Sequence, residues 1–162
     1  MSTYRAKIVW KSDSPELFAI NQYTRGHSWD FDGGVKVPAS SSPQAVRVPF
    51  SVEAAVDPEE ALVASVSSCH MLSFLWVVAK NGFIAESYED NAIGEMTTSD
   101  EGKQWISKIT LDPHIVWSGD KVPTAEELAH MHHEAHEVCY IANTIKSEII
   151  IMSKPANVTT EL

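Results

Sequence analysis

Two cysteines, Cys69 and Cys139, carry the most reactive side chains in this sequence. They lie 70 residues apart and lack C-x-x-C spacing, so only the fold can bring them together. Free cysteine is among the most buried residue types, which makes two inert core thiols the simplest interpretation. The functional interpretation is a redox pair, in which one thiolate attacks an oxidant and the second thiol resolves the product.

A thiolate in either position needs a nearby positive charge, because burial alone raises the pKa of a thiol. Arg25, beside Gly26, is a candidate for this cation, although a lone arginine is more often a solvated surface charge. Glu59 could orient such an arginine through a bidentate contact, or simply complement a helix dipole. Ten residues of helix separate Glu59 from Cys69 by about 15 Å. A Glu59 that serves a cysteine directly is therefore most naturally supplied by a partner chain.

A histidine-rich run from His130 to His136 is a candidate metal site. The residue four after His133 is Glu137, so the H-E-x-x-H zinc pattern is not met. His132 and His136 do share one helix face, at i and i+4. A polar helix face that is rich in histidine explains the run better than a metal centre does, given the strict geometry of zinc ligands.

Three neighbours of Cys69 have other expected roles. His70 points about 100° away from Cys69 around a helix, which makes it a core or interface histidine rather than a base for the thiol. Phe74 and Trp76 are candidates for the wall of an apolar pocket.

The element that must position Cys69 is predicted to be a helix from Asp57 to Gly82. Asp57 is a suitable N-cap, Pro58 fits the first helical position, and Lys80 complements the dipole in the last turn. Gly82 provides the left-handed residue that commonly ends a helix. Apolar residues cover all sides, which predicts burial. A membrane span is not expected, because six residues at the middle interrupt any run of about 18 apolar residues. These are Ser65, Ser67, Ser68, Cys69, His70 and Ser73.

The N-terminal third predicts strands and loops. Tyr4 to Lys11 alternates in period two, which predicts a half-buried strand. Glu16 to Gln22 has no clear period and is expected to be a loop or a short turn of helix. His27 to Val37 predicts a hairpin across Asp32-Gly33-Gly34, which provides the positive φ angles of tight turns. From Ala39 to Val56 the composition predicts irregular structure.

The C-terminal half predicts a hairpin, a helix and a strand. Ile84 to Thr97 and Trp105 to Trp117 are expected to form a long antiparallel hairpin. Thr124 to Glu127 is a capping box that begins a helix. The apolar face of that helix consists of Leu128, Met131, Ala135 and Val138. Cys139 to Ile145 is expected to continue it or to form a second short helix, and Glu148 to Met152 to form a last strand. This order is an α+β arrangement.

Length, composition and charge limit the possible partners. A chain of 162 residues with 44% apolar composition suits one domain over residues 1–162, or two small lobes at most. A formal charge of −10 argues against nucleic acid or an anionic membrane as partner. Because Met1 leads into a strand pattern without an apolar signal segment, we expect a cytoplasmic protein whose cysteines stay reduced.

The sequence resembles the OsmC/Ohr family of thiol-dependent peroxidases, and its OsmC-like branch most closely. The segments that carry the resemblance are Tyr23 to Gly34, Asp57 to Leu62, Ser67 to Leu72, Tyr88 to Asp90 and Ala135 to Cys139. They follow one another in the order of the family. Organic hydroperoxide resistance proteins differ at two places, since Tyr140 replaces their usual proline after the second cysteine and His70-Met71 replaces aromatic or small residues after the first.

The resemblance implies a fold, a site and a reaction. The fold is an intertwined α+β homodimer with curved antiparallel sheets around long, buried central helices. Cys69 would be the peroxidatic nucleophile, Cys139 the resolving thiol, Arg25 the cation that stabilises the thiolate, and Glu59 its carboxylate partner. The loop of Arg25 matches by order alone, so two other arginines stay candidates for that role. They are Arg5 and Arg47.

The expected function is reduction of organic hydroperoxides, with hydrogen peroxide as a second candidate substrate. Cys69 would become a sulfenic acid, Cys139 would condense with it to a disulfide, and an external dithiol would reduce that disulfide. No metal or flavin cofactor is expected. Two alternatives stay open: a non-catalytic dimeric small-ligand-binding or stress-associated protein of the same fold, and a metal-binding protein that uses His130 to His136.

Overall fold

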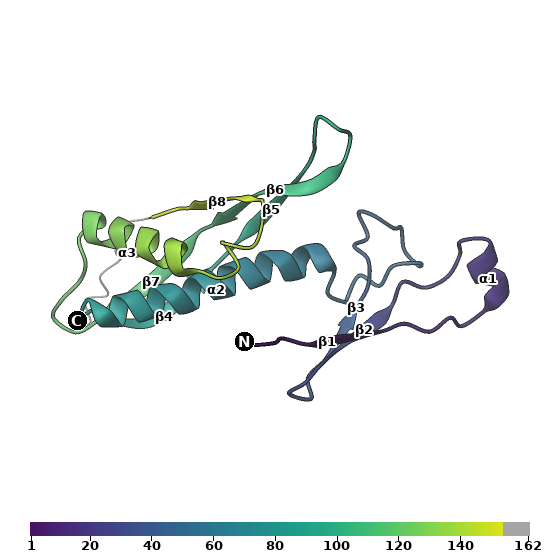
Figure 1. Ribbon diagram of the computed structural model, residues 1–162, viewed down its shortest axis with the longest axis horizontal. Coiled ribbons are helices and arrows are strands. Elements are labelled where there is room, and N and C mark those ends of the chain that lie inside the picture. Colours follow the sequence, from purple (N-terminus) through teal and green to yellow (C-terminus); the bar gives the residue numbers. More distant parts are fainter. Residues whose placement is uncertain (154–162) are drawn as a thin grey trace, which may run out of the picture. The chain divides into compact units, whose positions relative to one another are not determined.

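Residues 1–153 are described by a computed structural model, in which helices are interspersed among the strands along the chain (Figure 1). The chain forms two compact units, residues 1–61 and the residues from Leu62 onward. Helix α2 (Pro58–Lys80) begins in the first unit and continues into the second. The predicted α+β class is confirmed.

The first unit contains a three-stranded antiparallel sheet in the order β1-β2-β3. Its strands are β1 (Ala6–Val9), β2 (His27–Phe31) and β3 (Lys36–Ala39). The predicted hairpin between β2 and β3 is confirmed. The Phe31 N–H donates to the Val35 carbonyl at 2.9 Å, and Gly34 has a φ of 86° in the turn. A positive φ at this place explains the glycine.

Helix α1 (Pro15–Ala19) and strand β1 refine two N-terminal predictions. The Ser14 hydroxyl caps α1 by accepting from the Leu17 N–H at 3.2 Å, so a side-chain cap begins this helix. The period-two pattern predicts a half-buried β1, yet all four strand residues are exposed in the single chain, with Ile8 59% exposed. The alternating pattern of apolar and polar residues correctly predicted the strand, but it does not show what covers the apolar side of that strand.

Helix α2 begins and ends where its sequence predicts. The Asp57 carboxylate accepts from the Glu60 N–H at 2.7 Å, and the Glu60 carboxylate accepts from the Asp57 N–H at 3.3 Å. This reciprocal pair is a capping box. Gly82, with a φ of 75°, follows the last turn.

Burial of α2 is one-sided, which differs from the predicted burial on all sides. The buried residues are Val66, His70, Phe74, Val77 and Val78. On the opposite side, Leu72 is 63% exposed and Trp76 is 56% exposed. By length and composition alone α2 could cross a membrane, a test that core helices of globular proteins also pass. Its inner side packs into the two apolar clusters of the second unit, as expected for a core helix.

The second unit contains the predicted hairpin, divided into two ladders. Its strands are β4 (Ile84–Asp90), β5 (Ile93–Thr98), β6 (Gln104–Leu111), β7 (Pro113–Ser118) and β8 (Glu148–Ile151). Strand β4 pairs with β7 and β5 with β6, all antiparallel, while β8 runs parallel to β6. The Asp90 carboxylate accepts from the Asp112 N–H at 2.7 Å, which joins the two places where the ladders break.

Helix α3 (Ala125–Val138) begins with the predicted capping box of Thr124 and Glu127. Of its predicted apolar face, Leu128, Met131 and Ala135 are buried, whereas Val138 is 44% exposed. Both alternatives predicted for Cys139 to Ile145, a continuation of α3 and a second short helix, are wrong, because the chain forms turns there. The Asn143 amide donates to the carbonyls of Glu137 and Cys139 at 3.0 and 3.1 Å, so side-chain bonds replace helical ones.

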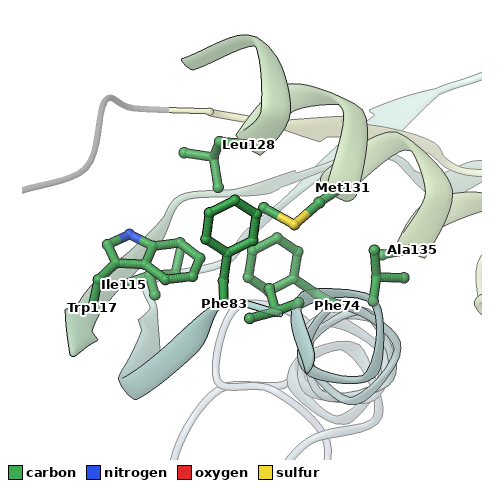
Figure 2. Close-up of a cluster of buried hydrophobic side chains, with 9 residues drawn as sticks. Phe74, Phe83, Ile115, Trp117, Leu128, Met131 and Ala135 are labelled. Carbon is green, nitrogen blue, oxygen red and sulfur yellow. The ribbon is translucent and has the colours of Figure 1, made fainter. Parts of the chain in front are cut away.

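The main apolar core lies between α2, α3 and strand β7 (Figure 2). Its buried members are Phe74, Val77, Val78, Phe83, Ile115, Trp117, Leu128, Met131 and Ala135. In Figure 2, Leu128, Met131 and Ala135 point from α3 toward Phe74 and Phe83. A smaller cluster of Val66, Ile109 and Leu111 lies between α2 and β6. These contacts hold α3 beside α2, and each of these helices brings one cysteine.

Candidate functional site

The structure brings Cys69 and Cys139 together. Cys69 lies on α2, and Cys139 is the residue that ends α3. The Cys139 thiol lies close enough to the Cys69 sulfur for the two side chains to interact. Both are free thiols, with Cys139 only 1% exposed and Cys69 partly exposed. One sulfur can therefore be reached from the surface while the other is enclosed directly behind it.

The surroundings of Cys139 favour its protonated form. Burial raises the pKa of the Cys139 thiol, and the interaction with Cys69 raises it further. The backbone N–H groups of Ala142, at 3.5 Å, and of Ile141 oppose this with a smaller lowering effect. Cys139 is therefore held as a thiol.

Arg25 and Glu59 lie in the first unit, and the structure does not pair them. The Arg25 guanidinium donates to Asn21 Oδ1 at 2.7 Å and to the Tyr23 carbonyl at 2.6 Å, and it lies 3.8 Å from the centre of the Tyr23 ring. No ion pair within residues 1–153 includes Arg25 or Glu59. Glu59 lies in the first turn of α2, where it complements the helix dipole.

A second arginine shares the surroundings of Arg25. The Arg47 guanidinium lies 5.6 Å from the centre of the Phe50 ring, and that of Arg25 lies 6.0 Å from the same ring. The backbone N–H of Arg25 also donates to the Phe50 carbonyl at 2.8 Å. Arg25 and Arg47 are therefore held around Phe50 in the first unit, whereas Arg5 is exposed just before β1.

The histidines divide into an exposed set and a buried set. His130 and His133 are exposed. His70 and His132 are 1% and 3% exposed, and His70 Nε2 lies 3.0 Å from His132 Nδ1. Their rings are nearly parallel, and the Phe74 ring stacks on His132 with 4.1 Å between centres. Among the residues that the structure describes, no group of three or more His, Cys, Asp or Glu side chains is arranged to hold a metal.

The two aromatic residues offered as pocket walls have different positions. Phe74 is fully buried in the main core, so it is not a wall of an open pocket in the single chain. Trp76 is 56% exposed, and the Lys80 ammonium lies 5.2 Å from the centre of its ring. Trp76 is therefore the residue of the two that is available to a ligand or to another chain.

Comparison with known proteins decides the family. The family model described as OsmC-like protein matches residues 51–154, which include α2, both ladders, α3 and both cysteines. The chain belongs to the OsmC family. The resemblance drawn from the two cysteine segments is thus confirmed.

Solved structures give the same result for the fold. An OsmC-like protein of unknown function from Vibrio cholerae is 50% identical, with a TM-score of 0.91 over 94% of this chain and 99% of that one. An OsmC-like protein from Mycoplasma pneumoniae is 14% identical, with a TM-score of 0.71 over 96% and 99% of the two chains. An organic hydroperoxide resistance protein from Elizabethkingia anophelis is 15% identical, with a TM-score of 0.64 over 93% and 94%. No curated protein matches the sequence significantly.

The OsmC family thus includes proteins described by hydroperoxide resistance, and the chain shares their fold. The pairing of His70 with His132 is the feature of this site that the sequence did not reveal. The two residues lie 62 positions apart, and no local pattern connects them. The only available signal was His70 itself, a polar residue in the middle of an otherwise apolar helix.

Proposed function

We propose that this OsmC-family protein is a thiol-dependent peroxidase that reduces organic hydroperoxides, with hydrogen peroxide as a second candidate substrate. One observation carries the proposal: a buried thiol, Cys139, lies beside a partly exposed one, Cys69. Two thiols in contact can form a disulfide with little rearrangement, and the exposed member is the one that a peroxide can reach.

In the first step, the Cys69 thiolate attacks the distal oxygen of the hydroperoxide. The S–O bond forms as the O–O bond breaks, and the alkoxide takes a proton to leave as an alcohol. Cys69 becomes a sulfenic acid, and the sulfur is oxidised by two electrons. The exposure of Cys69 supports this assignment, because a peroxide can reach its sulfur while Cys139 is buried.

In the second step, the Cys139 sulfur attacks the Cys69 sulfur. The S–S bond forms, the S–O bond breaks, and the hydroxide that leaves combines with the proton of Cys139 to give water. An external dithiol then reduces the disulfide by thiol–disulfide exchange and becomes a disulfide itself. The cycle requires no metal or flavin. The external dithiol is its reductant and not a bound cofactor.

We assign Arg25 the role of the cation and Glu59 the role of its carboxylate partner, following the family resemblance. The contacts of Arg25 support a free charge, because its hydrogen bonds go to the neutral oxygens of Asn21 and Tyr23. The Tyr23 and Phe50 rings lie nearby, and neither neutralises the guanidinium. On substrate binding, Arg25 would exchange these neutral partners for the thiolate and Glu59.

The working protein that we propose is a homodimer in which each chain, residues 1–162, acts as one domain. The exposed side chains of Leu72 and Trp76 on α2 support this proposal, because large apolar residues exposed on a central helix are typical of a surface that contacts another chain. A reducing compartment such as the cytoplasm would keep both cysteines as thiols between cycles.

The test is a count of free thiols and a mass measurement after brief, near-stoichiometric cumene hydroperoxide. We expect the reduced protein to lose two thiols rapidly and two mass units of hydrogen, as an intramolecular disulfide requires. In a Cys139→Ser variant, a sulfenic-acid reagent should label Cys69. Cys69→Ser is the matched control, because it keeps the buried thiol and should consume no peroxide.

Persistence of both thiols in the parent protein would contradict the peroxidase. The non-catalytic dimeric ligand-binding or stress-associated protein would then be the better description of this chain. Sulfenic acid on Cys139 rather than on Cys69 would reverse the two roles that we assign.

A further inference from the structure

A buried pair of histidines joins the two elements that carry the thiols. His70 follows Cys69 directly on α2, and His132 lies on α3 seven residues before Cys139. His70 Nε2 and His132 Nδ1 are 3.0 Å apart, and neither ring is more than 3% exposed. A neutral imidazole has one donor nitrogen and one acceptor nitrogen, so the two rings can share this bond in either tautomeric arrangement.

This bond is the directional contact inside the α2–α3 interface. Besides the contact of the two thiols, two side-chain hydrogen bonds join the helices within residues 1–153. The other, from the Lys80 ammonium to Glu134 at 2.7 Å, lies at the surface, where ion pairs contribute little. The remaining contacts are apolar and do not fix direction, so they tolerate small shifts of one helix against the other. A buried hydrogen bond does not, because it weakens steeply with distance and angle.

We propose that the His70–His132 pair is a positioning element that holds Cys69 against Cys139 and so prepares them for disulfide formation. This inference rests on the proposed function for its role in catalysis, but the thiol contact that it explains is independent of any peroxide. Both histidines act through the helices and do not touch the reacting sulfurs. Two apolar side chains would pack here without needing each other, whereas a buried imidazole without its partner costs free energy. The pair therefore favours one register of α2 and α3.

The surroundings keep the pair neutral at pH 7. Burial, with a smaller contribution from His136 on α3, lowers the pKa of His70 to about 4, although Asp90 at the end of β4 opposes this. Burial lowers the pKa of His132 to about 3. Tyr88 on β4, whose ring packs against Phe74, has a pKa raised by burial and stays neutral as well. Acid would place a charge in this core and loosen the two helices.

The test measures how quickly the reduced protein closes its disulfide with the thiol oxidant diamide. Cys69 adds to the N=N bond, and Cys139 then displaces the resulting hydrazine, so that two electrons and two protons pass from the thiols to the diamide. We expect His132→Leu and His70→Leu to slow the second step by at least about tenfold, as a displacement of reacting groups commonly does. His132→Asn, whose amide can replace Nδ1, should recover part of that rate.

Two controls keep structural loss apart from positioning. His133→Asn changes an exposed histidine of the same helix and should close its disulfide at the rate of the parent. The ratio of second-step to first-step rates should fall in the parent between pH 5 and pH 3, where the buried imidazoles take up protons, and should fall less in His70→Leu/His132→Leu, which has no imidazole at these two positions. A general loss of structure in the leucine variants would explain neither the recovery of the rate by asparagine nor the difference between the two pH profiles.

Circular dichroism shows whether His70→Leu and His132→Leu are folded. If they are folded and close the disulfide at the parent rate, the positioning role is overturned. If those variants do not fold, the pH profile of the parent decides the question, and a rate ratio that does not fall between pH 5 and pH 3 would overturn the role. Slower closure with diamide, together with thiols that resist cumene hydroperoxide, would support the positioning role while rejecting the proposed peroxidase.

Discussion

At the scale of single residues, the two thiols are chemically different although they touch. Cys139 is enclosed and its pKa is raised by burial, whereas Cys69 is partly exposed. Cysteine reactivity follows thiolate character and access, and Cys139 is disfavoured on both counts. This asymmetry supports the order of roles that we propose more strongly than the positions of Arg25 and Glu59, which belong to the other unit.

The buried histidines also make a prediction about stability. The pKa values of His70 and His132 are lowered to about 4 and about 3, whereas an unfolded histidine titrates near 6.5. Above pH 6.5 neither state binds these protons. As the pH falls from 6.5 toward 4, the unfolded state binds protons that the folded state excludes, so the free energy of unfolding decreases.

We expect this decrease to be about 2 kcal/mol or more between pH 7 and pH 5, as measured by urea unfolding. Other titrating groups contribute as well, so the informative quantity is the difference from His70→Leu/His132→Leu. That double variant should lose distinctly less stability over the same interval. Equal losses in the two proteins would mean that the two imidazoles accept protons in the folded state without cost.

At the scale of elements, Asp90 connects helix α2 to both breaks in the hairpin. One carboxylate oxygen accepts from the Ser67 hydroxyl on α2, and the other accepts from the Asp112 N–H. We expect Asp90→Ala to lower the free energy of unfolding by about 1–3 kcal/mol, because it removes the acceptor of two part-buried donors. Asp90→Asn keeps an acceptor oxygen and should cost less.

The measurement is urea unfolding at pH 7, where the neighbouring histidines are neutral. Asp100→Ala is a matched control, because Asp100 is an exposed aspartate in the turn between β5 and β6 and should change the free energy of unfolding by less than about 0.5 kcal/mol. A result for Asp90→Ala as small as that of Asp100→Ala would show that the ladders hold their breaks together without this carboxylate.

The elements also show what local sequence can predict. The caps of α2, the capping box of α3 and the Asp32-Gly33-Gly34 turn are patterns of a few neighbouring residues, and all three were predicted correctly. The contact of Cys69 with Cys139 and the bond of His70 to His132 join distant positions, so no periodicity could reveal them. The cysteine contact was anticipated only through the family resemblance.

At the scale of the whole molecule, the single chain leaves apolar residues exposed on its central helix. Leu72 and Trp76 are one turn apart, at i and i+4, and therefore lie on the same side of α2. Full burial of side chains of this size contributes about 1.5–3 kcal/mol each. The hydrophobic pattern correctly marked this side for burial, but a pattern does not say whether the same chain or a second copy buries it.

If a second copy covers this side, a charge placed there should separate the chains. We expect the parent to have twice the 17.9 kDa mass of one chain by light scattering, and Leu72→Glu to shift toward the single-chain mass, because burying an unpaired carboxylate is costly. Ile93→Glu is the matched control. Ile93 is 62% exposed on β5, and its neighbour Gly94 approaches Val63 of α2, so Ile93 faces away from that helix. A parent protein with the single-chain mass would contradict the homodimer, and Trp76 would then stay open to a small apolar ligand.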